Sequence, residues 1–326
     1  MEYCVAIRTL GTAGQKYQTL LDSLNNQTIK PKKILVYIAE GYPIPNETIG
    51  CEEYIYCPKG MITQRSLSFD EIDTEFILFC DDDLWLADTF VEKMYEGLKT
   101  CQGDCIAPDV YGIQNLSSLC KLKVAIASYA FPRKNDDWAF KIMRNGNYTY
   151  NNHPQKEVLP TESAAGACML IKKEAYRAIH FEDERWMESF RFALGDDLLF
   201  FHKLHIMGYR VLIHYTAGIN HLDGGVGSKG LPDNWYRKKI ALSYIIQYRI
   251  KYSLKKNTNT DRVKCIWSNI LKFTEQFLFS FIRELIKSRK FIILDLFRGL
   301  NDGMKYVKSN YFQEIPAFDA YIKKQT

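Results

Sequence analysis

Three consecutive carboxylates, Asp81, Asp82 and Asp83, directly follow the apolar run at 76–80. Five apolar residues that end in charge predict a strand buried on both faces, which opens into a site at its carboxyl end. Like charges this close repel one another unless a cation lies between them. Oxygen ligands suit Mg²⁺ or Mn²⁺, and such ions commonly hold a diphosphate in proteins. A solvated acidic turn is the alternative interpretation.

Apolar patterning predicts strands that alternate with helices over the first two thirds of the chain. Strands are expected over 3–8, 33–39, 54–57, 76–80, 167–171 and 209–214, and helices over 62–71, from 89 and over 195–207. A helix is also predicted by the i, i+3, i+4, i+7 stripe of Tyr17, Leu20, Leu21 and Leu24. This alternation is typical of an α/β fold with a mostly parallel central sheet and flanking helices.

Polar side chains follow several of these predicted strands. Thr9, Glu40 and Lys59 each come at the end of a strand, as the three aspartates do. Ligands of open α/β sheets bind beyond the carboxyl ends of the strands. A solvated acidic turn would not explain why polar residues follow several predicted strands, so the sequence favours a binding site.

Charge divides the chain in two. Residues 233–326 carry 19 Lys and Arg against 8 Asp and Glu, a net charge of +11, which leaves a net charge of −6 for residues 1–232. The basic part reads as helical, with an apolar stripe of Ile266, Ile270, Phe273 and Phe277. This combination resembles an interfacial amphipathic segment and predicts an anionic partner, either lipid head groups or nucleic acid. The alternative is a helix packed on the main domain with a solvated basic face.

Cysteine usage and hydropathy predict a cytoplasmic protein. None of the nine cysteines forms a C-x-x-C pair, and Cys4, Cys80 and Cys168 lie in apolar segments, as small core residues do in a reducing compartment. The first ten residues lack the pattern of a signal peptide. No apolar run approaches the length of about 18–20 residues that a spanning helix needs.

The order of these segments resembles a family 2 glycosyltransferase of the GT-A fold, of the bacterial polysaccharide-biosynthesis type. The matching segments lie at 5–9, 60–65, 81–83, 195–199 and 208–211, and 298–303 resembles the tail of such proteins. The resemblance implies metal-dependent transfer of a sugar, with inversion, from a nucleotide donor to an acceptor hydroxyl in surface-polysaccharide synthesis. The chain is expected to have a catalytic domain over 1–232, with a donor half to about 110 and an acceptor half from 111. The net charge and the apolar stripe predict a helical, basic, membrane-associating tail over 233–326.

The resemblance also implies which residues hold the metal. Asp83 matches the position of the direct ligand of Mn²⁺ or Mg²⁺, and Asp81 faces the ribose or the metal. Asp82 is expected on the donor side, with the weakest claim of the three. His221 matches a position from which some members give an imidazole to the metal or the diphosphate, although a lone histidine in a loop is often a surface residue.

The catalytic base that the resemblance implies is Asp197, which follows Asp196 at a helix start. A carboxylate there takes the proton of the attacking hydroxyl; the alternative is an acidic pair that caps the helix. Thr9, Glu40 and Arg65 are expected to contact a UDP-sugar or dTDP-sugar, with Glu40 in place of the usual aspartate. The acceptor is expected to be a glycan or lipid-linked glycan, at the cytoplasmic face of the inner membrane.

Three other classes of protein fit the sequence less well. An aspartyl phosphatase places its acidic motif on the first strand, whereas here it follows several strands. A sugar nucleotidyltransferase needs a Gly-rich, basic phosphate loop near the N-terminus. A non-enzymatic protein that binds anionic surfaces through its basic tail is the third, but an acidic body and the absence of a recognition motif argue against nucleic acid as its partner.

Overall fold

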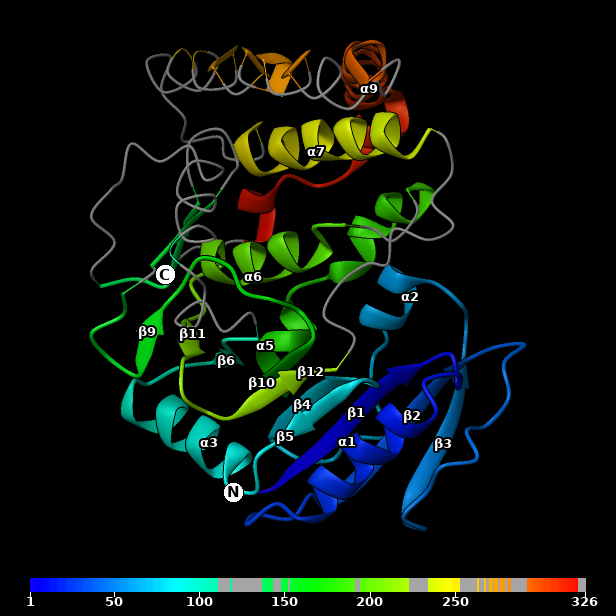
Figure 1. Ribbon diagram of the computed structural model, residues 1–326, viewed down its shortest axis with the longest axis vertical. Helices are drawn as coiled ribbons and strands as arrows, with labels where there is room; N and C mark the ends of the chain where they lie inside the picture. Colours follow the sequence, from blue (N-terminus) through cyan, green and yellow to red (C-terminus); the bar gives the residue numbers. More distant parts are fainter. Residues whose placement is uncertain are drawn as a thin grey trace.

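The central sheet of the computed structural model has eight strands, six of which point the same way (Figure 1). The structure describes residues 1–110, 118, 137–142, 148–151, 153–190, 194–222, 234–252, single positions between 263 and 282, and 292–321. The strands lie in the order β3 (Glu52–Cys57), β2 (Lys33–Ala39), β1 (Tyr3–Thr9), β4 (Phe76–Asp81), β10 (Cys168–Lys172), β6 (Cys105–Pro108), β11 (Val211–His214) and β9 (Val158–Pro160). Only β10 and β9 run in the opposite direction. The predicted α/β architecture with a mostly parallel sheet is confirmed.

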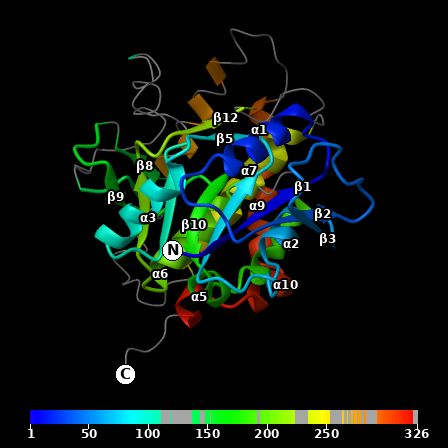
Figure 2. The same cartoon turned by 90° about the horizontal axis from the view of Figure 1, so that it is seen from below.

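Helices cover both faces of this sheet (Figure 2). One face packs on α1 (Gln15–Asn25) and α3 (Phe90–Thr100). The other face packs on α2 (Met61–Arg65), α5 (Lys173–Ala178), η2 (Phe181–Ser189) and α6 (Asp196–Ile206). Side chains alternate along each strand, so Val5 of β1 faces the first layer and Cys4 the second. Cys4, Cys80 and Cys168 are buried and form no disulfide, which confirms them as core residues.

Helix α2 is shorter than the sequence predicts. A helix over 62–71 was expected, but α2 ends at Arg65. The reason lies at Phe69, which has a positive φ of 48° and a fully buried ring that meets Tyr37, Phe79 and Tyr176 edge-on or nearly so. A continuing helix does not allow this backbone conformation. Burial of the aromatic ring therefore takes precedence over local helix propensity.

Several elements have no counterpart among the sequence predictions. Strand β6 in the centre of the sheet is one, and α5 and η2 are two more. Two small antiparallel pairs are also new, β5 (Leu84–Leu86) with β12 (Ile219–His221), and β7 (Phe140–Ile142) with β8 (Tyr148–Tyr150). Strands of three residues carry too short a pattern to be recognised in a sequence.

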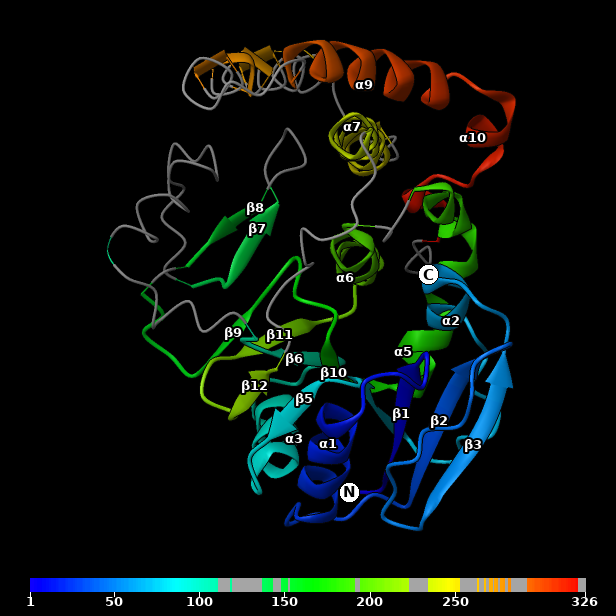
Figure 3. The same ribbon diagram turned by 45° about the vertical axis from the view of Figure 1, so that its right-hand side comes forward.

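The C-terminal helices pack in layers on the α6 side of the sheet (Figure 3). They are α7 (Trp235–Tyr252), α9 (Ile292–Val307), α10 (Asn310–Glu314) and η4 (Phe318–Tyr321). Ile245, Phe312 and Phe318 are buried in the same hydrophobic cluster as residues of the sheet. The described elements from Trp235 onward are thus all helical, and they share one core with the sheet. Among the described residues, no helix combines the length and hydropathy that crossing a bilayer requires.

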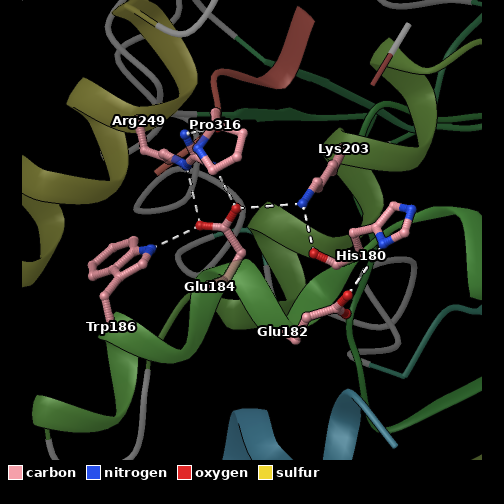
Figure 4. Close-up of polar contacts among 7 residues, drawn as sticks. All are labelled: His180, Glu182, Glu184, Trp186, Lys203, Arg249 and Pro316. Carbon is pink, nitrogen blue, oxygen red and sulfur yellow. Dashed lines mark hydrogen bonds and ion pairs between the residues drawn. The ribbon is translucent and has the colours of Figure 1, made fainter. Parts of the chain in front are cut away.

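A buried ionic cluster fastens α7 to this core. Glu184 of η2 is fully buried, and its carboxylate accepts hydrogen bonds from Arg249 of α7 at 2.7 and 3.1 Å and from the indole of Trp186 at 2.7 Å (Figure 4). The ammonium group of Lys203 on α6 lies 3.6 Å away. Burial alone would raise the pKa of Glu184, but Arg249 and Lys203 outweigh it and hold the pKa below its usual range. Arg249 also donates a hydrogen bond to the carbonyl of Pro316, and this bond attaches the segment after α10 to α7.

We expect Glu184→Gln to destabilise the protein by about 3–5 kcal/mol, because it removes the buried carboxylate charge that pairs with Arg249 and Lys203. Urea unfolding followed by circular dichroism measures this change. Glu182→Gln is the matched control, since Glu182 is about half exposed and pairs only with the exposed His180. Equal stabilities of the two variants would show that the cluster contributes nothing beyond a surface ion pair.

Candidate functional site

A pocket of about 330 Å³ lies at the carboxyl ends of β1 and β4. Because these strands are parallel neighbours, Thr9 and the end of the 76–81 strand meet at one edge of the sheet. The residues that line the pocket are Arg8, Thr9, Leu10, Thr12, Ala13, Lys16, Gln64, Asp82 and Asp83. The sequence prediction of a site beyond the strand ends has its counterpart here. It missed Thr12, Lys16 and Gln64, whose only sequence signal is a polar side chain in a loop or a helix.

The three consecutive aspartates have three different partners. Asp81 accepts a hydrogen bond from Arg8 at 3.1 Å and does not line the pocket. Asp82 lines it and accepts a hydrogen bond from the hydroxyl of Thr9. Asp83 lines it and lies 3.1 Å from the imidazole of His221, measured from Oδ1 to Nε2. Burial raises the pKa values of Asp81 and Asp82, against the opposing effects of Arg8 on the first and Thr9 on the second.

The contact between Asp83 and His221 depends on the β5–β12 ribbon. Its register places His221 opposite Leu84, the residue after Asp83, and the amide of Leu222 donates to the carbonyl of Asp83 at 2.8 Å. Both side chains are about three quarters buried or more. Within the described part of the chain no group of three or more His, Cys, Asp or Glu side chains forms a metal site. A cation between Asp83 and His221 would have these two side chains as ligands, and few protein ligands are usual for an ion that also binds substrate phosphates.

Asp196 and Asp197 occupy the first turn of α6, and Arg65 binds this turn. The N-cap position belongs to Gly195, with φ of 92°, so neither aspartate is the N-cap residue. The Asp196 carboxylate lies 2.9 Å from Nε of Arg65, and both side chains are about nine-tenths buried. Asp197 accepts a hydrogen bond from the amide of Leu198 at 2.7 Å. Burial and the neighbouring charge of Asp196 raise the pKa of Asp197 to about 6, although Arg65 acts in the opposite direction.

Arg65 connects the two acidic groups. Its charge acts on Asp81 at the strand end as well as on Asp196 and Asp197 of α6. The guanidinium group fits beside Gly166, where a Cβ atom would lie against Arg65 and within 3.0 Å of the Cβ of Asp197. Gly166 precedes β10, whose antiparallel pairing with β4 brings it to the same edge of the sheet. The structure thus brings together five predicted carboxylates, Arg65 and Thr9.

Glu40 and Lys59 have no contact with the acidic groups just described among the contacts of the described residues. Glu40 is exposed beyond the end of β2 and does not line the pocket. The ammonium group of Lys59 donates to the hydroxyl of Tyr42 at 2.6 Å and lies over its ring. A contact of Glu40 with a nucleotide base therefore stays a prediction.

Solved structures show what this fold is similar to. No protein-family description and no curated protein matches the chain by sequence. A crystal structure of S. aureus TarS is 12% identical, with a TM-score of 0.52 over 95% of this chain. S. aureus TarS 1–349 in complex with UDP-GlcNAc is also 12% identical, with a TM-score of 0.51 over 99% of this chain. The match covers half of the first TarS chain and 84% of the second. At this identity the likeness concerns the fold.

The raised pKa of Asp197 predicts how a neutral substitution alters stability with pH. The folded-state value of about 6 lies above the value near 3.9 of an unfolded chain. The protonated carboxyl of Asp197 therefore contributes to the free energy of unfolding in full below about pH 4, and this contribution is lost as the pH rises through 6. The side chain of the Asp197→Asn variant does not titrate, so the variant does not lose stability in this pH range.

We expect the free energy of unfolding of Asp197→Asn, relative to wild type, to increase between pH 4 and 6 and to level off above pH 6. Urea unfolding at several pH values measures it. Asp196→Asn is the control and should be destabilised instead, because Arg65 then loses its partner. A pH-independent difference for Asp197→Asn would contradict the raised pKa.

Proposed function

We propose that this protein is a metal-dependent, inverting glycosyltransferase of the GT-A, family 2 type, which transfers a sugar from a nucleotide donor to an acceptor hydroxyl. One observation carries the proposal. Arg65 interacts electrostatically with Asp81, whose neighbours Asp82 and Asp83 line the pocket, and with a second carboxylate, Asp197, whose pKa is raised to about 6. Such a reaction needs both groups, one for the diphosphate and one for the proton. The fold shared with a protein that was solved with UDP-GlcNAc supports a sugar nucleotide as the donor.

On the donor side, Asp83 and His221 would hold the cation. When bound, Mn²⁺ or Mg²⁺ neutralises the charge that develops on the departing diphosphate. A mixed pair of oxygen and nitrogen ligands suits Mn²⁺ better than Mg²⁺, which prefers oxygen. Asp82 and Thr9, which are hydrogen-bonded to each other and line the pocket, would contact the donor, a UDP-sugar or dTDP-sugar. Asp81 holds Arg8 in place instead of facing the pocket.

On the acceptor side, Asp197 takes the proton from the attacking hydroxyl. A base with a pKa near 6 is ionised at neutral pH and accepts a proton more readily than an ordinary aspartate does. Its oxygen Oδ1 is held by the amide of Leu198, and Asp196 is held by Arg65, so the first turn of α6 is fixed. Attack by the hydroxyl oxygen on the anomeric carbon breaks the bond to the diphosphate in the same step, which inverts the configuration.

An aspartyl phosphatase finds no support in this geometry. Asp81, the first carboxylate of the motif, is paired with Arg8 and does not line the pocket, so it is not placed as a nucleophile. We further propose a cytoplasmic enzyme of bacterial surface-polysaccharide synthesis, with a glycan or lipid-linked glycan as acceptor. Incubation with a panel of UDP-sugars and dTDP-sugars, with Mn²⁺, Mg²⁺ or EDTA, tests the proposal by release of nucleoside diphosphate. No release with any donor would overturn it.

We expect Asp83→Ala to abolish Mn²⁺-dependent binding of UDP, measured by calorimetry, because the cation loses its carboxylate ligand. His221→Ala should weaken the same binding less, since Asp83 remains. Asp70→Ala is the control, because Asp70 is largely exposed and pairs with Arg177 far from the pocket lining. Unchanged Mn²⁺-dependent binding in the Asp83 variant would remove this residue from the metal site.

We expect Asp197→Asn to lower kcat by roughly 10²–10⁴-fold with donor affinity near normal, the usual effect of removing a positioned base. In wild type, kcat should fall as the pH drops below about 6, where Asp197 becomes protonated. The variant should lose this acid limb. Steady-state rates of diphosphate release between pH 5 and pH 8 measure both effects, and a retained limb would assign it to another group.

A further inference from the structure

The face of α9 that points away from the rest of the protein combines apolar and basic side chains. Its exposed apolar residues are Leu294, Phe297 and Met304, and its exposed basic residues are Arg298, Lys305 and Lys308. No exposed acidic residue lies on this helix. Asp295 and Asp302 are partly buried, and Asp302 binds Arg237 of α7 at 2.9 Å. We call these six exposed side chains the outer α9 face.

The opposite face of α9 is fixed tightly to α7. A Cβ atom at Gly299 would clash with the carbonyl of Arg237, and one at Gly303 would contact the ring of Tyr244. The two glycines, four residues apart, therefore allow the helices to approach closely where α9 crosses α7 (Figures 1 and 3). Leu296 of α9 is buried. The outer α9 face is thus a fixed surface of the folded protein, and not a loose tail.

The described residues between 263 and 282 extend this surface. They lie beside α9 at the same end of the molecule (Figures 1 and 3), and the rings of Phe277 and Phe297 are 6.1 Å apart. Trp267 and Leu271 are about 60% exposed. This stretch and α9 together supply ten of the sixteen large apolar side chains that are exposed in the described part of the chain. Ile266, part of the predicted stripe, lies outside the described residues. An exposed apolar surface of this kind marks an interaction site.

We propose that the outer α9 face binds an anionic lipid bilayer, with α9 lying in the plane of the head groups. Phe297, Leu294 and Met304 would enter the acyl boundary, while the basic side chains contact lipid phosphates. A second copy of the chain fits this face less well. A twofold interface brings each surface against itself, and here that would oppose basic side chains with no exposed acids among them. The proposal concerns binding alone and does not depend on sugar transfer.

The test uses the whole chain, because removal of the residues after 233 would also remove Ile245 and Phe318 from the core. Co-sedimentation with phosphatidylglycerol-containing vesicles and with pure phosphatidylcholine vesicles measures binding at low and high salt. We expect binding to the anionic vesicles only, weakened by salt. The double variant Arg298→Gln/Lys305→Gln should bind about 25-fold more weakly, from a loss of about fivefold for each basic residue. Phe297→Ser should weaken binding about tenfold or more.

Matched controls separate this face from general charge and hydrophobicity. Lys156→Gln/Arg210→Gln removes two exposed basic residues elsewhere, and Tyr56→Ser removes an exposed aromatic residue of β3. Both controls should bind as wild type, and thermal melts should show all variants folded. Wild type that ignores anionic vesicles at low salt, or α9 variants that bind as well as the controls, would overturn the proposal. A dimer that Phe297→Ser dissociates, without vesicle binding by wild type, would assign the face to a second copy instead.

Discussion

The proposed site depends on an imbalance of charge at one edge of the sheet. Five carboxylates, at 81–83 and 196–197, gather around two arginines, Arg8 and Arg65. Arg8 neutralises part of the strand-end group and Arg65 part of the α6 group, which leaves both groups with excess negative charge. Such an excess is relieved by a cation or by a proton. Burial, together with the charge of Asp196, raises the pKa of Asp197 and so favours its protonated form, and we propose that Asp83 and His221 favour a bound cation.

The C-terminal helices pack on the α6 side of the sheet (Figure 3) and help to fix α6, which carries part of this site. Helix α6 carries Asp197 at its first turn and Lys203 in its interior, and Lys203 lies in the buried cluster with Glu184 and Arg249. Because Arg249 belongs to α7, the orientation of α6 is coupled to the C-terminal helices. These helices therefore have two roles in our interpretation. Their inner faces complete the core, and the outer α9 face meets the membrane where a lipid-linked acceptor would lie.

Much of the fold and part of the site could be predicted from the sequence. Strands such as 76–80 are buried on both faces, so their patterns are local and continuous. The rule that ligands bind at the carboxyl ends of parallel strands then selected Thr9 and the three aspartates. Asp197 was predicted as the base from the family resemblance, which rests on an acidic pair at a helix start and so on another local pattern. The end of α2 was predicted wrongly, since the position of the Phe69 ring depends on partners from β2, β4 and α5.

The sequence by itself determined the alternation of strands and helices, the edge of the sheet that carries charge, and the basic, partly apolar character of the C-terminal segment. Only the tertiary structure decided which charge pairs with which. Asp81 turns to Arg8, Asp83 meets His221 across 138 positions, and Arg65 reaches Asp196. Glu184 finds Arg249 across 65 positions in the same way. Periodicity encodes which face of an element is buried, but a buried charge is stabilised by a partner that the chain topology supplies from far along the sequence.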